Sequence, residues 1–393
     1  MFKKLVLFIP LMLLTCGNQP TSKTIEFWQF WTDPKAKPVI ESVVQQFEEE
    51  NPGWKVNVTD LTWSDGHQKI VVAFGAGNPP DLLELGSDWI AEFAAGHALA
   101  KLDIDTSLFM QLQPGIYDGS LYAQPWFLGS RVLYFNKSLL EKVNSSLPQD
   151  WPQLLQICRA IDSLDKDLAG FGANLAEPHR LYKKFLPFVW SCGGDIVQDG
   201  RIVLDNPEVL EALEFYQKLT ECGTVEIQRH LEDAFVEGQI GFLMSGGWFL
   251  KRLEENPPAF PYELAVMIPA KPGEKAYSFA GGEYLVIPQK SKRKEAAKKL
   301  MDLLVQPDNA ATLCDSVGFG FAPYKKRVRQ HLSSGEQLLF EQLQNSRSTP
   351  VNPRWVYVEA IIENMVEQVT LGKLEPDEAI KQAQAKIVET LKY

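Results

Sequence analysis

The order of hydrophobic patterns along the chain predicts an α/β fold. Short apolar or alternating segments, typical of strands, take turns with segments whose apolar residues recur every three or four positions, typical of helices. This alternation predicts mostly parallel sheets flanked by helices and joined by right-handed crossovers. A chain of 393 residues is longer than one typical domain, so two lobes are expected.

The N-terminal part shows the alternation most clearly. Trp54, Val56 and Val58 alternate with polar residues, as in a strand with one buried face. Asp33 and Pro34 are typical of a helix start, because a carboxylate caps free N–H groups and proline fits the first turn. Strands are predicted over residues 25–30, 54–58 and 81–85, with one helix starting near residue 33 and another over 65–74.

The same pattern continues to the C-terminus. Gly372 is expected to end one helix and Pro376 to begin the last, since glycine favours helix ends and proline favours first turns. Further strands are predicted over 132–135, 240–244, 264–268 and 284–287. Further helices are predicted over 151–161, 206–222 and 295–304, and the chain is expected to be mostly helical from 335 onward.

The first residues resemble an export signal. Lys3 and Lys4 precede an apolar run over 5–14, which is too short to span a bilayer. The ending Leu-Leu-Thr-Cys resembles a bacterial lipobox, although Thr15 stands where a smaller residue is usual. We therefore expect a signal peptide over 1–15, a lipid on Cys16, a linker over 16–23, and a protein exported to the periplasm or cell surface. An ordinary cleaved signal with an incidental cysteine is the alternative.

Charge and motif content exclude several function classes. The net charge of −11 argues against binding nucleic acid or anionic lipid surfaces. The sequence contains no HExxH, GxSxG or P-loop motif, and its five histidines are scattered. Neither a metal site nor a cofactor is expected.

Four cysteines follow Cys16, at positions 158, 192, 222 and 314. Their spacing contains no CxxC motif, so a zinc site is not expected. Export permits disulfides, and Cys192 with Cys222 is the first pair to test. Four unbonded thiols are an equal alternative, because a chain of this size does not need disulfides.

Six short segments together resemble one protein family, the bacterial extracellular solute-binding proteins of ABC importers, in the sugar-binding group that includes maltose-binding protein. The resemblance covers nearly everything after Lys23. It is carried by GAGNPPD over 75–81, Pro125 with LYFNK over 133–137, SGGW over 245–248, AGGEYLVI over 280–287, EAAKKL over 295–300 and GKLEPDEA over 372–379.

The resemblance implies two lobes that close on a ligand by a hinge motion. The crossings between lobes would lie near 128–131, 279–283 and 320–327. Residues 24–128 and 282–326 would form one lobe, and 132–279 and 327–393 the other. The family's function implies a monomeric protein that catalyses no reaction. It would carry a mono- or oligosaccharide to the transmembrane subunits of an ABC permease.

Tryptophan is abundant, with ten in the chain, and several follow strands. A sugar ring packs its C–H face on an indole, while its hydroxyls need polar partners. Core packing is the alternative for each tryptophan and is preferred for Trp28 and Trp54. Trp248 is the first candidate, because two glycines before it permit close approach to a ligand. The other candidates are Trp31, Trp89, Trp126, Trp190 and Trp355.

Polar candidates accompany these rings. Asp33 and Asp88 follow strands, where α/β sheets bind ligands, but both have an alternative role as helix N-caps. The resemblance adds Glu177 and His179, with histidine where the family commonly has tyrosine. Glu283 is expected either to accept a hydrogen bond from a sugar hydroxyl or to stabilise the hinge. In the second case Arg131 would pair with it in a purely structural role. Gly282, Tyr284 and Arg354 complete the candidates.

Two other functions stay open at this point. Paired carboxylates beside aromatic rings also suit an exported glycoside hydrolase. An enzyme that retains the anomeric configuration needs two carboxyl groups about 5 Å apart. A binder of another solute is the second alternative. Few basic residues near the candidate segments argue against a sugar phosphate, whereas the abundant acids leave a polyamine open.

Overall fold

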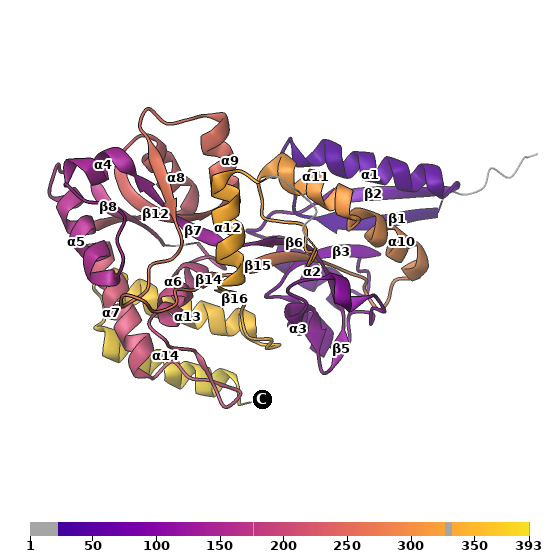
Figure 1. The fold of residues 1–393 in the computed structure, drawn as a ribbon. Coiled ribbons are helices and arrows are strands. Elements are labelled where there is room, and N and C mark those ends of the chain that lie inside the picture. Colours follow the sequence, from indigo (N-terminus) through magenta and orange to yellow (C-terminus); the bar gives the residue numbers. More distant parts are fainter. Residues whose placement is uncertain (1–22, 176, 327–331, 393) are drawn as a thin grey trace, which may run out of the picture.

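A computed structural model describes residues 23–175, 177–326 and 332–392. The expected signal segment, Cys16 and the end of the third expected crossing lie outside these residues. Figure 1 shows two lobes side by side, each built on a five-stranded sheet with helices on both faces. Among the described residues, no helix is long and apolar enough to cross a membrane.

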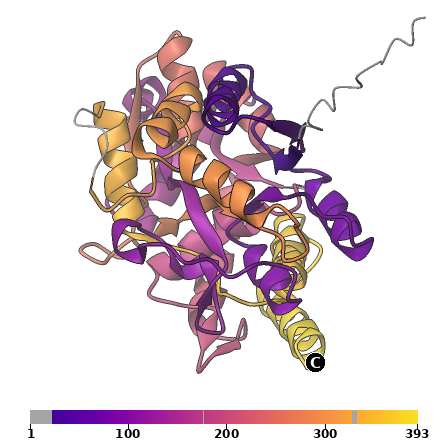
Figure 2. The same ribbon diagram turned by 90° about the vertical axis from the view of Figure 1, so that its right-hand side faces the viewer.

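The N-terminal lobe contains a sheet with the strand order β2-β1-β3-β15-β6. Its first three strands are parallel, and β15 runs antiparallel to both of its neighbours. Helix α1 packs against α10 and α11 on one face, while α2 and α3 cover the other (Figures 1 and 2). The elements are β1 (Lys23–Gln29), α1 (Ala36–Glu50), β2 (Trp54–Asp60), α2 (Gly66–Gly75), β3 (Leu82–Gly86), α3 (Ile90–Ala95), η1 (Thr106–Leu108), η2 (Gln113–Gly115), β4 (Ile116–Tyr117), β5 (Ser120–Leu121), β6 (Ala123–Gly129), β15 (Gly281–Val286), α10 (Lys294–Leu304) and α11 (Pro307–Val317).

The C-terminal lobe contains a sheet with the order β11-β8-β12-β7-β13. Strand β8 runs parallel to β11 and β12, and β7 runs antiparallel to β12 and β13. The elements are β7 (Arg131–Asn136), α4 (Lys137–Lys142), α5 (Trp151–Asp162), β8 (Ala169–Asn174), α6 (Leu181–Ser191), β9 (Val197–Gln198), β10 (Arg201–Ile202), α7 (Pro207–Glu221), β11 (Gly223–Glu226), α8 (Gln228–Val236), β12 (Ile240–Gly246), α9 (Gly247–Glu255), β13 (Tyr262–Ala265), β14 (Ser278–Phe279), α12 (Ser334–Gln344), β16 (Ser346–Arg347), α13 (Trp355–Thr370) and α14 (Pro376–Thr390).

Three segments connect the lobes. The chain passes from β6 to β7 at Ser130, returns from β14 to β15 at Ala280, and leaves α11 for α12 through residues 318–321. Buried serines hold the first connection in place. The Ser278 hydroxyl donates to the Arg131 carbonyl at 2.7 Å, and the Ser130 hydroxyl donates to the Leu339 carbonyl at 2.6 Å.

The predicted α/β class is confirmed, but the sheets are mixed rather than mostly parallel. The first three strands are parallel as predicted, because helices α1 and α2 connect them. Strand β15 enters from the other lobe, so no crossover helix sets its direction, and it pairs antiparallel. The strand expected over 264–268 lies earlier, at 262–265.

Helices α6 and α11, each of 11 residues, were not predicted from the sequence, and α6 lies closest to the candidate site. Helix α6 is buried on nearly every side and contains Pro187, so its sequence lacks the polar face that marks an amphipathic helix.

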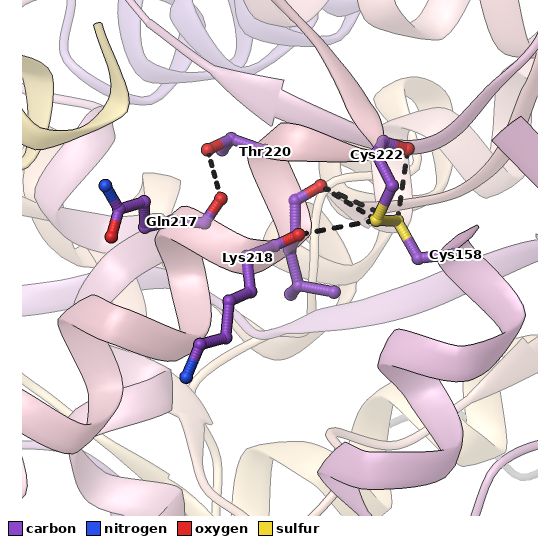
Figure 3. Close-up of a disulfide and its surroundings, with 6 residues drawn as sticks. Cys158, Gln217, Lys218, Thr220 and Cys222 are labelled. Atoms are coloured by element: carbon purple, nitrogen blue, oxygen red, sulfur yellow. Dashed lines mark hydrogen bonds between the residues drawn. A yellow bond between two sulfur atoms is a disulfide. The ribbon is translucent and has the colours of Figure 1, made fainter. Parts of the chain in front are cut away.

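The disulfide differs from the expected pair. Cys158 on α5 is bonded to Cys222 at the end of α7, with 5.9 Å between their Cα atoms (Figure 3). Cys192, at the end of α6, is not disulfide-bonded. The expectation of a Cys192–Cys222 bond is therefore wrong. The parallel pairing of β11 with β8 explains the observed bond, because it brings the end of α7 to the end of α5.

Candidate ligand site between the lobes

A pair of opposed glycines provides space where the lobes meet. Gly129 of β6 lies directly opposite Gly281 of β15. The Phe319 ring lies 3.7 Å from the position that a Gly129 side chain would take, and Arg131 Nη1 lies 3.8 Å from the corresponding position at Gly281. Both side chains therefore rest on one face of the connecting strands.

Four aromatic rings surround this place. Trp31, which follows β1, contacts Phe127 edge-on with centroids 5.2 Å apart and Phe319 with centroids 5.0 Å apart. Trp248 of α9 stacks on Phe319 at 5.8 Å and 16°. Because α9 belongs to the C-terminal lobe and β1 to the N-terminal lobe, the rings form a continuous row from one lobe to the other.

Local backbone geometry places two of these rings. Phe319 lies between Gly318 and Gly320, whose φ angles of +65° and +57° are left-handed. A side chain at Gly320 would come 1.8 Å from the Leu128 carbonyl oxygen. A side chain at Gly246 would come 2.1 Å from the Trp248 ring, whose Nε1 donates to Glu232 Oε1 at 2.9 Å.

Two buried carboxyl groups share this face of the sheet. Glu283 is opposite Gly86, and Leu285 is opposite Glu84, so Glu84 and Glu283 are diagonal neighbours on β3 and β15. Burial raises the pKa of Glu84 to about 8, although the Phe30 N–H, which donates to it at 2.7 Å, opposes the shift. Burial and the nearby Glu84 raise the pKa of Glu283 well above its usual range.

Arg131 is the cation beside these carboxyl groups. Its guanidinium carbon lies 5.1 Å from the Phe279 ring centroid and 5.8 Å from that of Trp248. Burial lowers its pKa to about 10, which leaves the guanidinium charged at neutral pH. We call Trp31, Glu84, Phe127, Arg131, Trp248, Glu283 and Phe319 the Arg131 cluster.

A second group of residues joins the lobes directly. Asp88, in the turn after β3, is buried and pairs with Lys183 Nζ of α6 at 2.9 Å. The Tyr182 hydroxyl donates to the same carboxylate at 2.7 Å. Burial opposes ionisation of Asp88, but Lys183 and Tyr182 outweigh it, so the pKa of Asp88 is lowered.

His179 lies beside this ion pair. Its ring contacts the Trp89 ring edge-on at 5.9 Å, and its Nδ1 is hydrogen-bonded to the buried Glu359. That bond raises the pKa of His179, and a φ of +66° makes its backbone conformation costly for a residue other than glycine. We call Asp88, Trp89, His179, Tyr182, Lys183 and Glu359 the Asp88 cluster.

The structure brings together six of the residues predicted for ligand binding. Trp31, Trp248 and Glu283 belong to the Arg131 cluster, and Asp88, Trp89 and His179 belong to the Asp88 cluster. Asp33 lies in the exposed turn before α1, where its carboxylate accepts the Lys35 N–H at 2.7 Å. This position agrees with the alternative of a local structural role better than with a ligand contact.

Three further predicted tryptophans lie in the packed interior, and Trp89 itself is only 1% exposed. Trp126 is fully buried and donates from Nε1 to the Leu304 carbonyl at 3.2 Å. The register of β6 against β15 shifts beside it, so Trp126 packs with Phe127 in the N-terminal core. Trp190 and Trp355 belong to the main core of the C-terminal lobe.

The other predicted residues make contacts within the protein. Glu177 accepts from the Gln228 N–H at 2.9 Å, and Arg354 Nη1 donates to the Thr390 carbonyl at 2.6 Å. The Gly282 carbonyl accepts the Ser87 N–H at 3.0 Å, and the Tyr284 hydroxyl donates to the Gln111 carbonyl. These bonds fix loops and strands near the two clusters.

Several residues of the site were missed in the sequence reading. Phe319 had a recognisable signal in the sequence. It lies between two glycines, which have no side chains to cover its ring. Trp63 follows β2 and stacks on Phe30 at 4.2 Å, beside Trp89. Glu84 and Lys183 gave no signal, because one lies inside a buried strand and the other in the unrecognised helix α6. Among the described residues, no group of three or more histidine, cysteine or acidic side chains is placed to hold a metal ion.

Comparisons with known proteins agree with this architecture. The family model of the bacterial extracellular solute-binding proteins matches residues 32–311. A binding protein of Brucella abortus is 29% identical over 91% of either chain. The diacetylchitobiose binding protein DasA of Streptomyces coelicolor is 26% identical over 86% of this chain and 83% of its own.

Solved structures show the same fold. A Thermotoga lettingae solute-binding protein bound to α-D-tagatose is 26% identical and has a TM-score of 0.83, covering 94% of this chain and all of its own. Maltose-bound MalE3 of T. maritima, at 24% identity and the same coverage, has a TM-score of 0.81 and shows the fold alone. The chain belongs to the bacterial extracellular solute-binding proteins, the non-enzymatic binding components of ABC transporters.

Proposed function

We propose that this protein is the sugar-binding receptor of an ABC importer and that its sugar binds at the Arg131 cluster. The observation that carries the proposal is the row of rings Trp31, Phe319 and Trp248, drawn from both lobes and their connection, beside buried charged groups. A sugar ring can pack its C–H face on these rings while its hydroxyls meet Glu283 and Arg131.

The ligands named for relatives support a sugar. They include diacetylchitobiose, maltodextrin, maltose and α-D-tagatose. Relatives named for sn-glycerol 3-phosphate are 21% identical, so a phosphate ester belongs in any ligand screen.

The proposed mechanism is closure of the lobes around the sugar. The sugar shifts the population toward the closed form to the extent that it binds that form better than the open one. In the closed form the Asp88–Lys183 ion pair joins the lobes beside the Arg131 cluster. The closed, loaded protein is then the form that the permease subunits of the importer recognise.

The proposal includes a lipid anchor on Cys16. The lipobox-like ending of the signal segment supports it, and two or three acyl chains would hold the protein stably on a membrane. In cells, Cys16→Ala should move the protein from the membrane fraction to the soluble exported fraction. Unchanged membrane association of this variant would contradict the anchor.

A thermal-shift screen tests the sugar assignment. The chain starting at Asn18 is mixed with saccharides, sugar phosphates and polyamines, and its unfolding midpoint is recorded. A saccharide at 100 times its dissociation constant stabilises the fold by about 2.7 kcal/mol, which raises the midpoint by a few degrees. A higher midpoint with a saccharide that is recovered intact supports the proposal. An unchanged midpoint with every saccharide contradicts it.

A further inference from the structure

We propose that Glu232 is a positioning residue for Trp248 and fixes this ring of the Arg131 cluster in the orientation that receives the sugar. This inference rests on the proposed function and deepens it, because Glu232 lies outside the cluster and was not among the residues predicted for binding. A positioning residue acts through another side chain, so Glu232 is expected to set affinity without touching the sugar.

Three donors converge on one oxygen of Glu232. Trp248 Nε1 donates to Oε1 at 2.9 Å, the Ser245 hydroxyl at 2.7 Å and the Gln228 amide at 2.8 Å. The side chain of Glu232 is 8% exposed, and Arg252 Nη1 lies 4.0 Å from its other oxygen. Hydrogen bonds to a charged acceptor are stronger than bonds between neutral groups, so this oxygen holds its donors firmly.

The donors reach Glu232 from two directions. Ser245 and Trp248 flank the turn between β12 and α9, while Gln228 lies one helical turn before Glu232 on α8. Ser245 and Gln228 are buried, whereas Trp248 is partly exposed. Glu232 therefore ties a partly exposed ring to two side chains that are fixed in the interior.

Packing on its faces leaves the orientation of the Trp248 ring open. The ring stacks on Phe319 at 5.8 Å and 16°, and it lies so near Gly246 that a side chain there would come 2.1 Å from it. Stacking tolerates rotation of a ring within its own plane, whereas a hydrogen bond has a preferred direction. The bond to Glu232 is directional and therefore selects one orientation.

A ring that is already held lowers the cost of binding. A side chain that must be ordered when a ligand binds weakens the affinity by about 2- to 12-fold. The bond from Trp248 to Glu232 avoids this loss, because the ring has its orientation before the sugar arrives. Removing the bond should therefore weaken binding by the same factor.

Nuclear magnetic resonance without any ligand tests the hold on the ring. In protein containing isotope-labelled tryptophan, each indole N–H gives its own signal, and the signal of Trp248 is the one missing from Trp248→Phe. Glu232→Met removes the acceptor oxygens, so this signal should move upfield or split. Glu232→Gln keeps one neutral acceptor oxygen and should move the signal less.

A double-mutant cycle tests the effect on binding. Maltose, α-D-tagatose and diacetylchitobiose are measured by calorimetry, and the one that binds the parent protein most tightly is used for the variants. Glu232→Met should bind it about 2- to 12-fold more weakly, and Glu232→Gln should recover part of this loss. In a Trp248→Phe background, Glu232→Met should cause no further loss, because the indole N–H is already absent.

Asp233→Asn is the matched control. Asp233 neighbours Glu232 on α8, its side chain is 41% exposed, and it pairs with Arg252. This variant should keep both the affinity and the Trp248 signal of the parent protein. Urea unfolding of every variant separates lost binding from lost stability. If Glu232→Met does not fold, Glu232→Gln takes its place in both experiments.

The outcomes distinguish this inference from the proposed function. An unchanged Trp248 signal in Glu232→Met would overturn the positioning role. A moved signal with unchanged affinity would overturn it as well, as would equal losses with and without the Trp248 N–H, since Glu232 would then serve the fold alone. If neither the three sugars nor any saccharide of the thermal-shift screen binds, the proposed function fails. The signal of the ligand-free protein then supports or overturns the hold of Glu232 on the ring by itself.

Discussion

Asp88 of the N-terminal lobe and Lys183 of the C-terminal lobe form a buried ion pair, with 2.9 Å between Oδ2 and Nζ. The side chain of Asp88 is only 3% exposed, and the Tyr182 hydroxyl also donates to it. A carboxylate in this setting is stable only while its partners from the other lobe remain in contact. The pair therefore links closure of the lobes to the ionisation of Asp88.

Asp88→Asn is expected to favour the open form. Removing the charge leaves Lys183, whose side chain is 18% exposed, without its partner, a loss that costs at most about 3–5 kcal/mol. Small-angle X-ray scattering at pH 7 should therefore give a larger radius of gyration for the variant than for the parent protein. Asp65→Asn, which removes an exposed pair with Lys69, is the control and should scatter as the parent does. Equal scattering of all three proteins would contradict the role given to Asp88.

The same pair predicts a response to acid. The folded pKa of Asp88 is lowered, so its contribution is present above the unfolded value of about 3.9 and is lost as pH falls through the folded value. The parent protein should open or unfold in that acid range, and the acid response of Asp88→Asn should be weaker. Scattering and unfolding measured from pH 7 to about pH 2 test this prediction, and equal acid responses of the parent protein and Asp88→Asn would contradict it.

Two tryptophans should respond in opposite ways to replacement by alanine. Trp248→Ala removes a ring from the Arg131 cluster and should weaken binding of a neutral saccharide at least about tenfold while the protein stays folded. Trp126→Ala removes a fully buried ring and should lower the free energy of unfolding by about 3–5 kcal/mol. Binding measured by calorimetry and stability measured by urea unfolding, for both variants, test these two expectations. An unchanged affinity in Trp248→Ala would exclude that ring from the site.

The disulfide should stabilise the C-terminal lobe. It joins residues 64 positions apart, for which chain entropy gives a contribution of about 4 kcal/mol. Replacing both Cys158 and Cys222 by alanine should lower the unfolding midpoint, while Cys192→Ala should have a much smaller effect. Peptide mass spectrometry under non-reducing conditions should recover a Cys158–Cys222 peptide with Cys192 alkylated. A Cys192–Cys222 peptide would contradict the structure.

Glu84 predicts a loss of stability as the solution becomes more alkaline. Its folded pKa of about 8 exceeds the ordinary value of 4.5, so the folded protein holds a proton that the unfolded chain releases. The free energy of unfolding should fall between about pH 4.5 and pH 8, by at most about 1.4 kcal/mol per pH unit from this group. Glu84→Gln should flatten this dependence, and exposed Glu49→Gln should leave it unchanged. Urea unfolding at pH 5 and pH 8 decides between the two results.

Periodic patterns explain why most of the fold was predictable. Strand β2 alternates polar and apolar residues, and α7 carries an apolar stripe between an Asn206 cap and its end, so each was recognised from local sequence. Helix α6 was not, because a helix buried on nearly all sides has no polar face to reveal its period. The direction of β15 depends on a connection between lobes, which local sequence does not encode.

The site was less predictable than the fold for a similar reason. Trp248 was identified because two glycines precede it, which is a local signal. Trp126 was a lower-ranked candidate in the sequence, and the register shift in β6 places it in the core. The pairing of Asp88 with Lys183 joins residues far apart in the chain, so only the arrangement of the lobes reveals it.

The position of β15 has a consequence for the order of folding. It lies between β3 and β6, so the N-terminal sheet lacks a central strand until residues 281–286 have been synthesised or exported. The C-terminal sheet, by contrast, is complete once residue 265 has emerged. A chain that emerges from its N-terminus can therefore complete the C-terminal sheet first. The N-terminal sheet stays incomplete until β15 has emerged.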